Sequence, residues 1–202
     1  MAYLTAEQRK ELHIKCSKVR IAYPHVFEPA RNAQSGAMEY STQVRFYKNK
    51  PEDMAQVEHI RKAMDNAARW AWGPDAEKRI KQAKNGGNTT CFLREDDDYF
   101  FINVKANPDR TTPRVVDRDK TRTLKPEDGR IYSGVTANVI FDLYARGGVN
   151  KSGINIPYGW SGTLLGVQFV EATDAFAGVS ATARDDDFDD LADDGFYDDD
   201  LI

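Results

Sequence analysis

Residues 39–72, EYSTQVRFYKNKPEDMAQVEHIRKAMDNAARWAW, hold a strand pattern followed directly by a helix pattern. Within residues 39–47 the even-numbered positions carry Tyr, Thr, Val and Phe, whereas the odd-numbered positions are mostly polar. This two-residue period predicts a strand with one buried face. From Pro51 onward, apolar residues recur every three or four positions until Gly73-Pro74, which predicts an amphipathic helix that ends at this dipeptide.

Strand patterns on either side of this stretch predict a mainly β fold. Residues 17–23 alternate in the same way, and Pro24 is expected to end that strand. Because the strands are not interleaved with helices, a doubly wound parallel sheet is disfavoured. The pattern favours a five-stranded OB-fold barrel with a helical insertion, about residues 51–84, between strands 2 and 3. The expected strands are residues 17–23, 39–47, 99–105, 131–146 and about 161–171.

The charge of the chain is divided between two unequal parts. Residues 185–202 contain ten Asp and no Lys or Arg, so this tail carries −10. Since the whole chain carries −4, residues 1–184 carry +6. A block of like charge this dense cannot pack, and we expect a disordered interaction tail. The expected organisation is a polar N-terminal arm (1–16), a barrel domain (17–171), a linker (172–184) and the acidic tail (185–202).

Composition argues against several classes of protein. No apolar run approaches the ~20 residues of a membrane-spanning helix. The first residues, MAYLTAEQRKELHIK, lack the apolar core of a signal peptide. The two cysteines, Cys16 and Cys91, are too few and too distant for a disulfide scaffold or a Cys-rich zinc site, and they fit a reducing cytoplasm.

Enzyme signatures are absent from the sequence, with one weak exception. No Walker A loop, G-x-S-x-G or H-E-x-x-H motif occurs, and the three histidines stand alone. The exception is Asp96-Asp97-Asp98, which could bind Mg²⁺ as a metal-dependent nuclease does. Because neighbouring residues in a strand or turn point in different directions, a solvated turn is the preferred interpretation. We therefore expect no catalytic residue, no metal site and no cofactor.

The body of the chain combines cations with aromatic residues. Residues 110–130 carry a net charge of +3, and Lys and Arg neutralise phosphates whatever the base sequence. Rings on the open face of a sheet offer stacking platforms to bases, which favours single-stranded nucleic acid, because a duplex hides its base faces. The predicted phosphate contacts are Arg20, Arg45, Lys105, Arg110, Arg114, Arg118, Lys120, Arg122 and Arg130. The predicted stacking residues are Tyr23, Tyr47, Tyr99, Phe101, Tyr132 and Trp160.

The acidic tail, DDDFDDLADDGFYDDDLI, carries apolar residues among its aspartates. A polyanion with spaced aromatics can occupy a groove built for phosphates and bases, or it can dock on a partner protein. Eighteen flexible residues span about 23 Å, which exceeds the expected radius of gyration of the body, about 16 Å. The residues predicted to bind partners are Asp185, Asp186, Asp187, Phe188, Asp189, Asp190, Phe196, Tyr197, Asp198, Asp199, Asp200, Leu201 and Ile202.

Several pieces of residues 17–171, taken in order, resemble the phage single-stranded DNA-binding proteins of the OB-fold type, a family first catalogued as a phage domain of unknown function. The pieces are KVRIAY (18–23), VFEP (26–29), YFFIN (99–103), PRVVD (113–117), IYSG (131–134) and GVQF (166–169). The resemblance implies an OB barrel with a helical insertion, sequence-independent binding of single strands, and roles in phage replication and recombination. It also implies a tail that recruits replication proteins, although this chain ends in Leu201-Ile202 where several such tails end in an aromatic.

Taken together, these features predict a non-enzymatic protein of the host cytoplasm. It would bind single-stranded DNA independently of sequence, protect it, and recruit replication proteins through its acidic tail. Two alternatives stay open at this point. One is a metal-dependent nuclease that uses Asp96–Asp98, and the other is an acidic-tailed adaptor or DNA mimic that binds protein only.

Overall fold

The computed structural model describes residues 4–33, 35–86, 92–149 and 152–176 of the chain. Its helices are α1 (Ala6–Leu12), α2 (Pro51–Trp72) and α3 (Ala76–Asn85), with 3-10 turns η1 (Gly73–Asp75) and η3 (Pro126–Asp128). Its strands are β1 (His13–Arg31), β2 (Met38–Tyr47), β3 (Arg94–Glu95), β4 (Tyr99–Ala106), β5 (Arg114–Val116), β6 (Thr136–Val149) and β7 (Asn155–Glu171).

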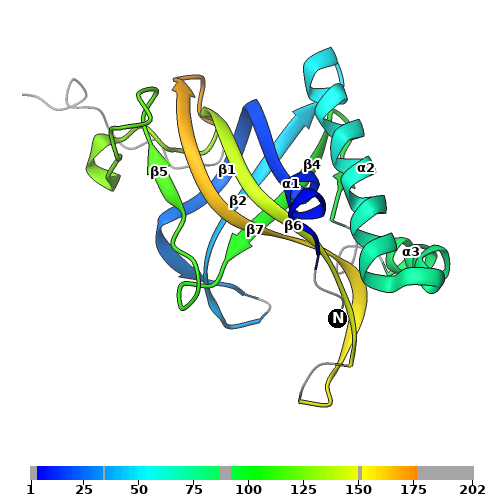
Figure 1. The fold of residues 1–202 in the computed structure, drawn as a ribbon. Helices are drawn as coiled ribbons and strands as arrows, with labels where there is room; N and C mark the ends of the chain where they lie inside the picture. Colours follow the sequence, from blue (N-terminus) through cyan, green and yellow to red (C-terminus); the bar gives the residue numbers. More distant parts are fainter. Residues whose placement is uncertain (1–3, 34, 87–91, 150–151, 177–202) are drawn as a thin grey trace, which may run out of the picture.

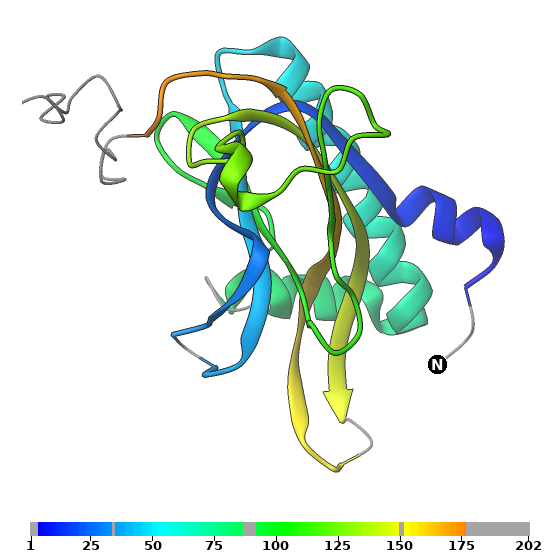
Figure 2. The same ribbon diagram turned by 90° about the vertical axis from the view of Figure 1, so that its left-hand side faces the viewer.

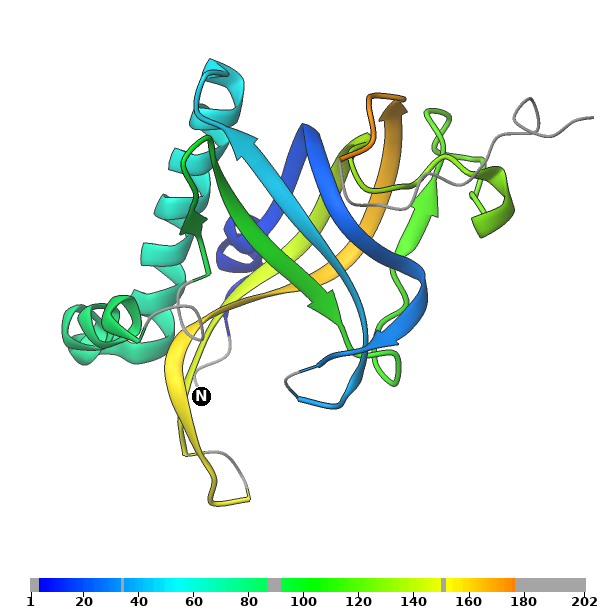
Figure 3. The same ribbon diagram turned by 180° about the vertical axis from the view of Figure 1, so that it is seen from behind.

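Five of these strands close into a barrel of OB type (Figures 1 and 3). The hydrogen-bonded order is β3-β4-β2-β1-β6-β7-β5, and neighbouring barrel strands along it are antiparallel. A parallel contact between β4 and β7, at Lys105 and Thr163, closes the circle. The barrel of β1, β2, β4, β6 and β7 confirms the predicted fold, and the short strands β3 and β5 extend its edges.

The helical insertion after β2 lies where the sequence predicts it, on one side of the barrel (Figure 1). Gly73, with a φ of 55°, ends α2, and Pro74 follows at the start of η1. The indole Nε1 of Trp160 on β7 donates to the carbonyl oxygen of Met64 on α2 at 2.8 Å, which ties the helix to the barrel. α1 lies beside α2 (Figure 2). Among the described residues, no helix is long and apolar enough to cross a membrane.

The first strand begins earlier than the sequence analysis expects. Residues 13–16, assigned there to a polar arm, pair with β6, and Cys16 is buried. The alternation of the strand is broken by Lys18, which has a φ of 53° and lies where the register between β1 and β6 shifts. This bulge hides the continuity of the strand from a period-2 search.

The same strand also continues past Pro24, so the expectation that Pro24 ends it is wrong. Pro24 lies where the register between β1 and β2 shifts, between the paired residues Ala22 and His25. At a bulge the missing N–H of proline removes no ladder hydrogen bond. The connection to β2 is therefore short, because β1 continues to Arg31.

The last two strands form a long hairpin that projects from the barrel (Figure 3). β6 begins at Thr136 rather than at residue 131, because the chain first turns at Gly134, which has a φ of 108°. β7 begins at Asn155, which pairs with Val149. The pairing of the two strands therefore extends beyond the expected ranges 131–146 and about 161–171.

Burial of the inward side of β4 should hold the barrel together. Ile102 is buried on β4, whereas Ile154 beside β7 is exposed. Ile102→Ala should lower the free energy of unfolding by about 2–5 kcal/mol, because it leaves a cavity. The same change at Ile154 should stay within about 0.5 kcal/mol. Urea unfolding measures both, and equal effects of the two variants would contradict the core assignment.

Candidate nucleic-acid interface

The outward side of β2 and β4 carries a cluster of aromatic rings. Arg45 is paired with Phe101 and Tyr47 with Tyr99 across the two strands, so all four side chains share the face opposite the barrel core. The Tyr47 and Tyr99 ring centroids are 5.8 Å apart, and those of Tyr99 and Phe101 are 6.0 Å apart. None of these three residues is fully buried. The structure thus brings together three of the predicted stacking residues and one predicted phosphate contact.

Arginine side chains lie on these rings. The Arg45 guanidinium carbon is 4.7 Å from the centroid of the Tyr99 ring, and Arg94 of β3 is 4.7 Å from that of Phe101. Arg45 also donates from Nε to the Gln43 side chain at 2.8 Å, which orients it along the strand. The Nε of Arg94 is buried and has no hydrogen-bond partner among the described residues. A buried donor without a partner is costly unless a ligand completes it.

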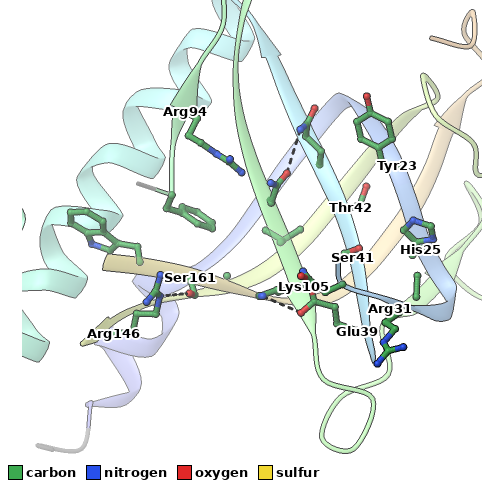
Figure 4. A pocket seen from close by; sticks show the side chains of 18 residues that line it. Tyr23, His25, Arg31, Glu39, Ser41, Thr42, Arg94, Lys105, Arg146 and Ser161 are labelled. Carbon is green, nitrogen blue, oxygen red and sulfur yellow. Dashed lines mark hydrogen bonds and ion pairs between the residues drawn. The ribbon is translucent and has the colours of Figure 1, made fainter. Parts of the chain in front are cut away.

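A groove of about 500 Å³ runs beside this cluster (Figure 4). Four cationic side chains line it, together with Glu39 as the only acidic lining residue among those described. Lys105 pairs with Glu39 at 3.0 Å, and Arg146 donates from Nε to Ser161 Oγ at 3.1 Å. The four cations are Arg31, Arg94, Lys105 and Arg146. An OB barrel binds oligonucleotides on this strand face, between the β1–β2 connection and the β6–β7 connection.

Tyr23 stands at the rim of this groove. It is 62% exposed, and its φ of 51° is rare for a residue with a large side chain. The backbone N–H of Tyr23 donates to Ser133 Oγ at 3.3 Å. At this bulge the N–H therefore bonds to a side chain outside β1. The bulge of β1 presents the Tyr23 ring to solvent on the groove side, where the sequence analysis placed a stacking residue (Figure 4).

The loop of residues 110–130 differs from the free cationic strip that its net charge suggests. Asp117 is buried and pairs with Arg130 at 3.0 Å and Arg122 at 3.3 Å. Arg118 donates to the carbonyl oxygen of Val170, and Arg114 to that of Lys120. These cations hold the loop against itself and β7. Lys120 and Arg110 are exposed in the loop and do not line the groove.

Two predicted site residues are fastened to the C-terminal segment instead of facing the groove. Arg20 donates to the carbonyl oxygens of Gly134 and Asp174. The Tyr132 hydroxyl donates to the carbonyl oxygen of Thr173 at 2.7 Å. The start of the predicted linker is therefore packed on the barrel.

Trp160 is a correction. Trp160 was predicted to stack on bases, but it is only 3% exposed. Its ring packs on Trp72 with centroids 5.5 Å apart, and its indole N–H donates to a carbonyl oxygen of α2. The ring serves the core below the groove and offers no face to a base. Apolar and polar residues alternate along this part of β7, which predicts which residues share a face with Trp160. The alternation does not reveal that α2 covers that face.

The candidate nuclease residues form a turn between β3 and β4. The Asp96 N–H donates to the carbonyl oxygen of Tyr99 at 2.8 Å, and Asp96 Oδ1 accepts from the Asp97 N–H. This backbone hydrogen bond, with a second from the Tyr99 hydroxyl, lowers the pKa of Asp96. No group of three potential metal ligands occurs within the described residues.

Burial raises the pKa of the Cys16 thiol to about 12, which leaves it inert as a nucleophile.

Three of the groove cations are not among the residues predicted from the sequence: Arg31, Arg94 and Arg146. Arg31 and Arg146 lie close to the two connections that flank an OB binding face, and this position was the available signal. Arg94 stands on a two-residue strand that no periodicity can detect. The tail residues, from Asp185 to Ile202, lie outside the described residues.

Comparisons with known proteins point to phage DNA-binding proteins. Residues 12–201 match the family model described as Enterobacter phage Enc34, ssDNA-binding protein. A relative, putative protein p50 of Acyrthosiphon pisum secondary endosymbiont phage 1, is 32% identical over 187 residues, 90% of this chain and 95% of the relative.

Solved structures share the fold at low identity. The single-stranded DNA-binding protein of bacteriophage Enc34, solved in complex with ssDNA, superposes with a TM-score of 0.58 at 20% identity, over 83% of this chain and 90% of that one. The single-stranded DNA-binding protein gp2.5 of bacteriophage T7 gives 0.52 at 14% identity, over 85% and 98%.

The ion pairs of Asp117 should matter for stability. Asp117→Asn should lower the free energy of unfolding by about 1–3 kcal/mol, because Arg122 and Arg130 lose a buried charged acceptor. Asp109→Asn, in the exposed turn after β4, is the matched control and should change little. Thermal or urea unfolding measures both. If Asp117→Asn proved as harmless as the control, these arginines would not be structural.

Proposed function

We propose that this chain, which belongs to the Enterobacter phage Enc34 ssDNA-binding protein family, binds single strands along the groove and ring cluster of β2 and β4. As a member of that family it is a phage single-stranded DNA-binding protein and not an enzyme. The proposal concerns where the strand lies and which side chains hold it.

The observation that carries this proposal is a row of rings and guanidinium groups beside a cationic groove. In this row Arg45 lies on Tyr99, Tyr99 contacts Phe101, and Arg94 lies on Phe101. Each base stacked on an aromatic ring contributes about 1–3 kcal/mol, and every base has a face to stack. Lys and Arg in the groove neutralise phosphates and release counterions, again without reading sequence. Binding through base faces and phosphates is therefore independent of sequence. The proposed contacts are Tyr23, Arg31, Arg45, Tyr47, Arg94, Tyr99, Phe101, Lys105 and Arg146.

In this role the protein coats single strands in the host cytoplasm during phage replication and recombination. Stacked bases are unavailable for re-pairing, and a coated backbone is shielded from nucleases.

The acidic tail, residues 185–202, recruits replication proteins through its aspartates and apolar residues. When no DNA is bound, the same tail competes for the cationic groove, because its −10 charge complements the +6 of residues 1–184.

Removing Arg94 should weaken binding of single strands. Arg94→Ala should cost about 1–3 kcal/mol, or about 5- to 150-fold in Kd, alike on all base sequences. The slope of log K against log salt should fall by about 1 if Arg94 contacts phosphate. Fluorescence anisotropy of labelled oligo-dT measures both quantities.

Arg61→Ala is the matched control, since Arg61 lies on α2 away from the groove and pairs with Glu58. It removes the same charge and should leave the affinity within about twofold. Equal losses in both variants would place the strand elsewhere. Absence of oligo-dT binding by the unaltered chain would favour the protein-only adaptor.

Removing the acidic tail should tighten binding at low salt. A chain that ends at Arg184 should bind oligo-dT about tenfold more tightly, because an intramolecular competitor lowers apparent affinity by the fraction of open grooves. The gain should shrink as salt screens the tail. A full-length chain with all ten tail aspartates changed to asparagine is the control for length. Unchanged or weaker affinity of the shortened chain would contradict competition by the tail.

A further inference from the structure

The ring row described above extends one member further than the barrel itself supplies. The Phe176 ring contacts two guanidinium groups, with its centroid 4.7 Å from the Arg20 carbon and 4.3 Å from the Arg45 carbon. Arg45 in turn lies on Tyr99. The full order is Arg20, Phe176, Arg45, Tyr99, Phe101 and Arg94.

Phe176 is the one member of this row that comes from outside the sheet, since β7 ends at Glu171. Removal of this ring would leave the Arg20 and Arg45 guanidinium groups without the ring that both of them contact. A nucleobase is also flat, and Arg stacks on it as it stacks on an aromatic side chain.

The barrel holds the segment that delivers this ring. The Phe176 N–H donates to the carbonyl oxygen of Ser133 at 3.1 Å. Thr173 donates from its N–H to the Tyr132 hydroxyl at 3.0 Å and from its Oγ1 to the Gly134 carbonyl oxygen at 2.7 Å. A Cβ at Gly134 would lie 2.5 Å from the carbonyl oxygen of Asp174, so only glycine lets the segment approach this closely.

We propose that the place which the Phe176 ring occupies against Arg20 and Arg45 is a base-binding subsite of the single-stranded DNA face, and that Phe176 fills it until a base replaces the ring. This inference rests on the proposed function, because it adds a subsite to the same face.

The test uses the full-length chain and oligo-dT. Phe176→Ala should tighten binding by about 2- to 30-fold, since the occupant of the subsite no longer stacks on the two arginines. Phe176→Leu should behave like Phe176→Ala, because leucine has no flat face. Phe176→Tyr keeps the ring and should bind like the unaltered chain. Arg45→Ala should weaken binding.

A second measurement reports the ring directly. The ¹⁹F resonance of 4-fluorophenylalanine placed at position 176 should move on saturation with oligo-dT, because the ring leaves the two guanidinium groups. An unmoved resonance overturns the inference. Weaker binding by Phe176→Ala would also overturn the inference, because Phe176 would then be a DNA contact itself. Unchanged binding by Phe176→Ala with a lower Tm would overturn it too, because Phe176 would then only stabilise the fold. In each of these cases the unaltered chain still binds oligo-dT, whereas its failure to bind would overturn the proposed function itself.

Discussion

The two-residue period shared by β2 and β4 is the constraint on which both the barrel and its binding face depend. The strands are paired without a register shift over eight residue pairs, so each inward residue has an outward neighbour at a fixed place. Val44 and Ile102 are thereby buried in the core while Arg45 and Phe101 share the outer face. A one-residue slip in the pairing would turn the outward rings into the core and the inward residues of that strand toward solvent. The packing energy of the interior therefore also fixes the geometry of the stacking face.

This dependence explains why the fold and the ring cluster could be predicted from the sequence. Alternation assigns Tyr47, Tyr99 and Phe101 to an open face without knowledge of any partner strand, and the change to a helical period after Pro51 places the insertion. Strand ends could not be predicted equally well. A barrel strand must bend, and β1 bends at Lys18 and Tyr23, non-glycine residues with positive φ that no turn signal marks.

The cations could not be sorted from sequence, because a net charge does not tell which cations are paired in the fold. The net +3 of residues 110–130 already subtracts Asp117, but it does not show that Arg122 and Arg130 both pair with this buried carboxylate or that Arg118 donates to the carbonyl oxygen of Val170. Arg94, by contrast, is followed by four acidic residues and would be discounted by any local sum. In the fold it lies on Phe101 at the groove with an unpaired Nε. The hydrogen-bond and ion-pair partners that each arginine finds in the fold, rather than local charge density, decide which arginines remain for a ligand.

The overall charge of −4 does not oppose binding of a polyanion, because screening limits which charges a phosphate can sense. At physiological salt the Debye length is about 8 Å, about half the expected radius of gyration of the body. A phosphate in the groove therefore responds to Arg31, Arg94, Lys105 and Arg146 and hardly to aspartates held far away. In the proposed competition, the tail acts only when it lies in or near the groove. The packed segment ends at Phe176 beside that face, nine residues before Asp185, and this connection would raise the local concentration of the proposed competitor without any change in net charge.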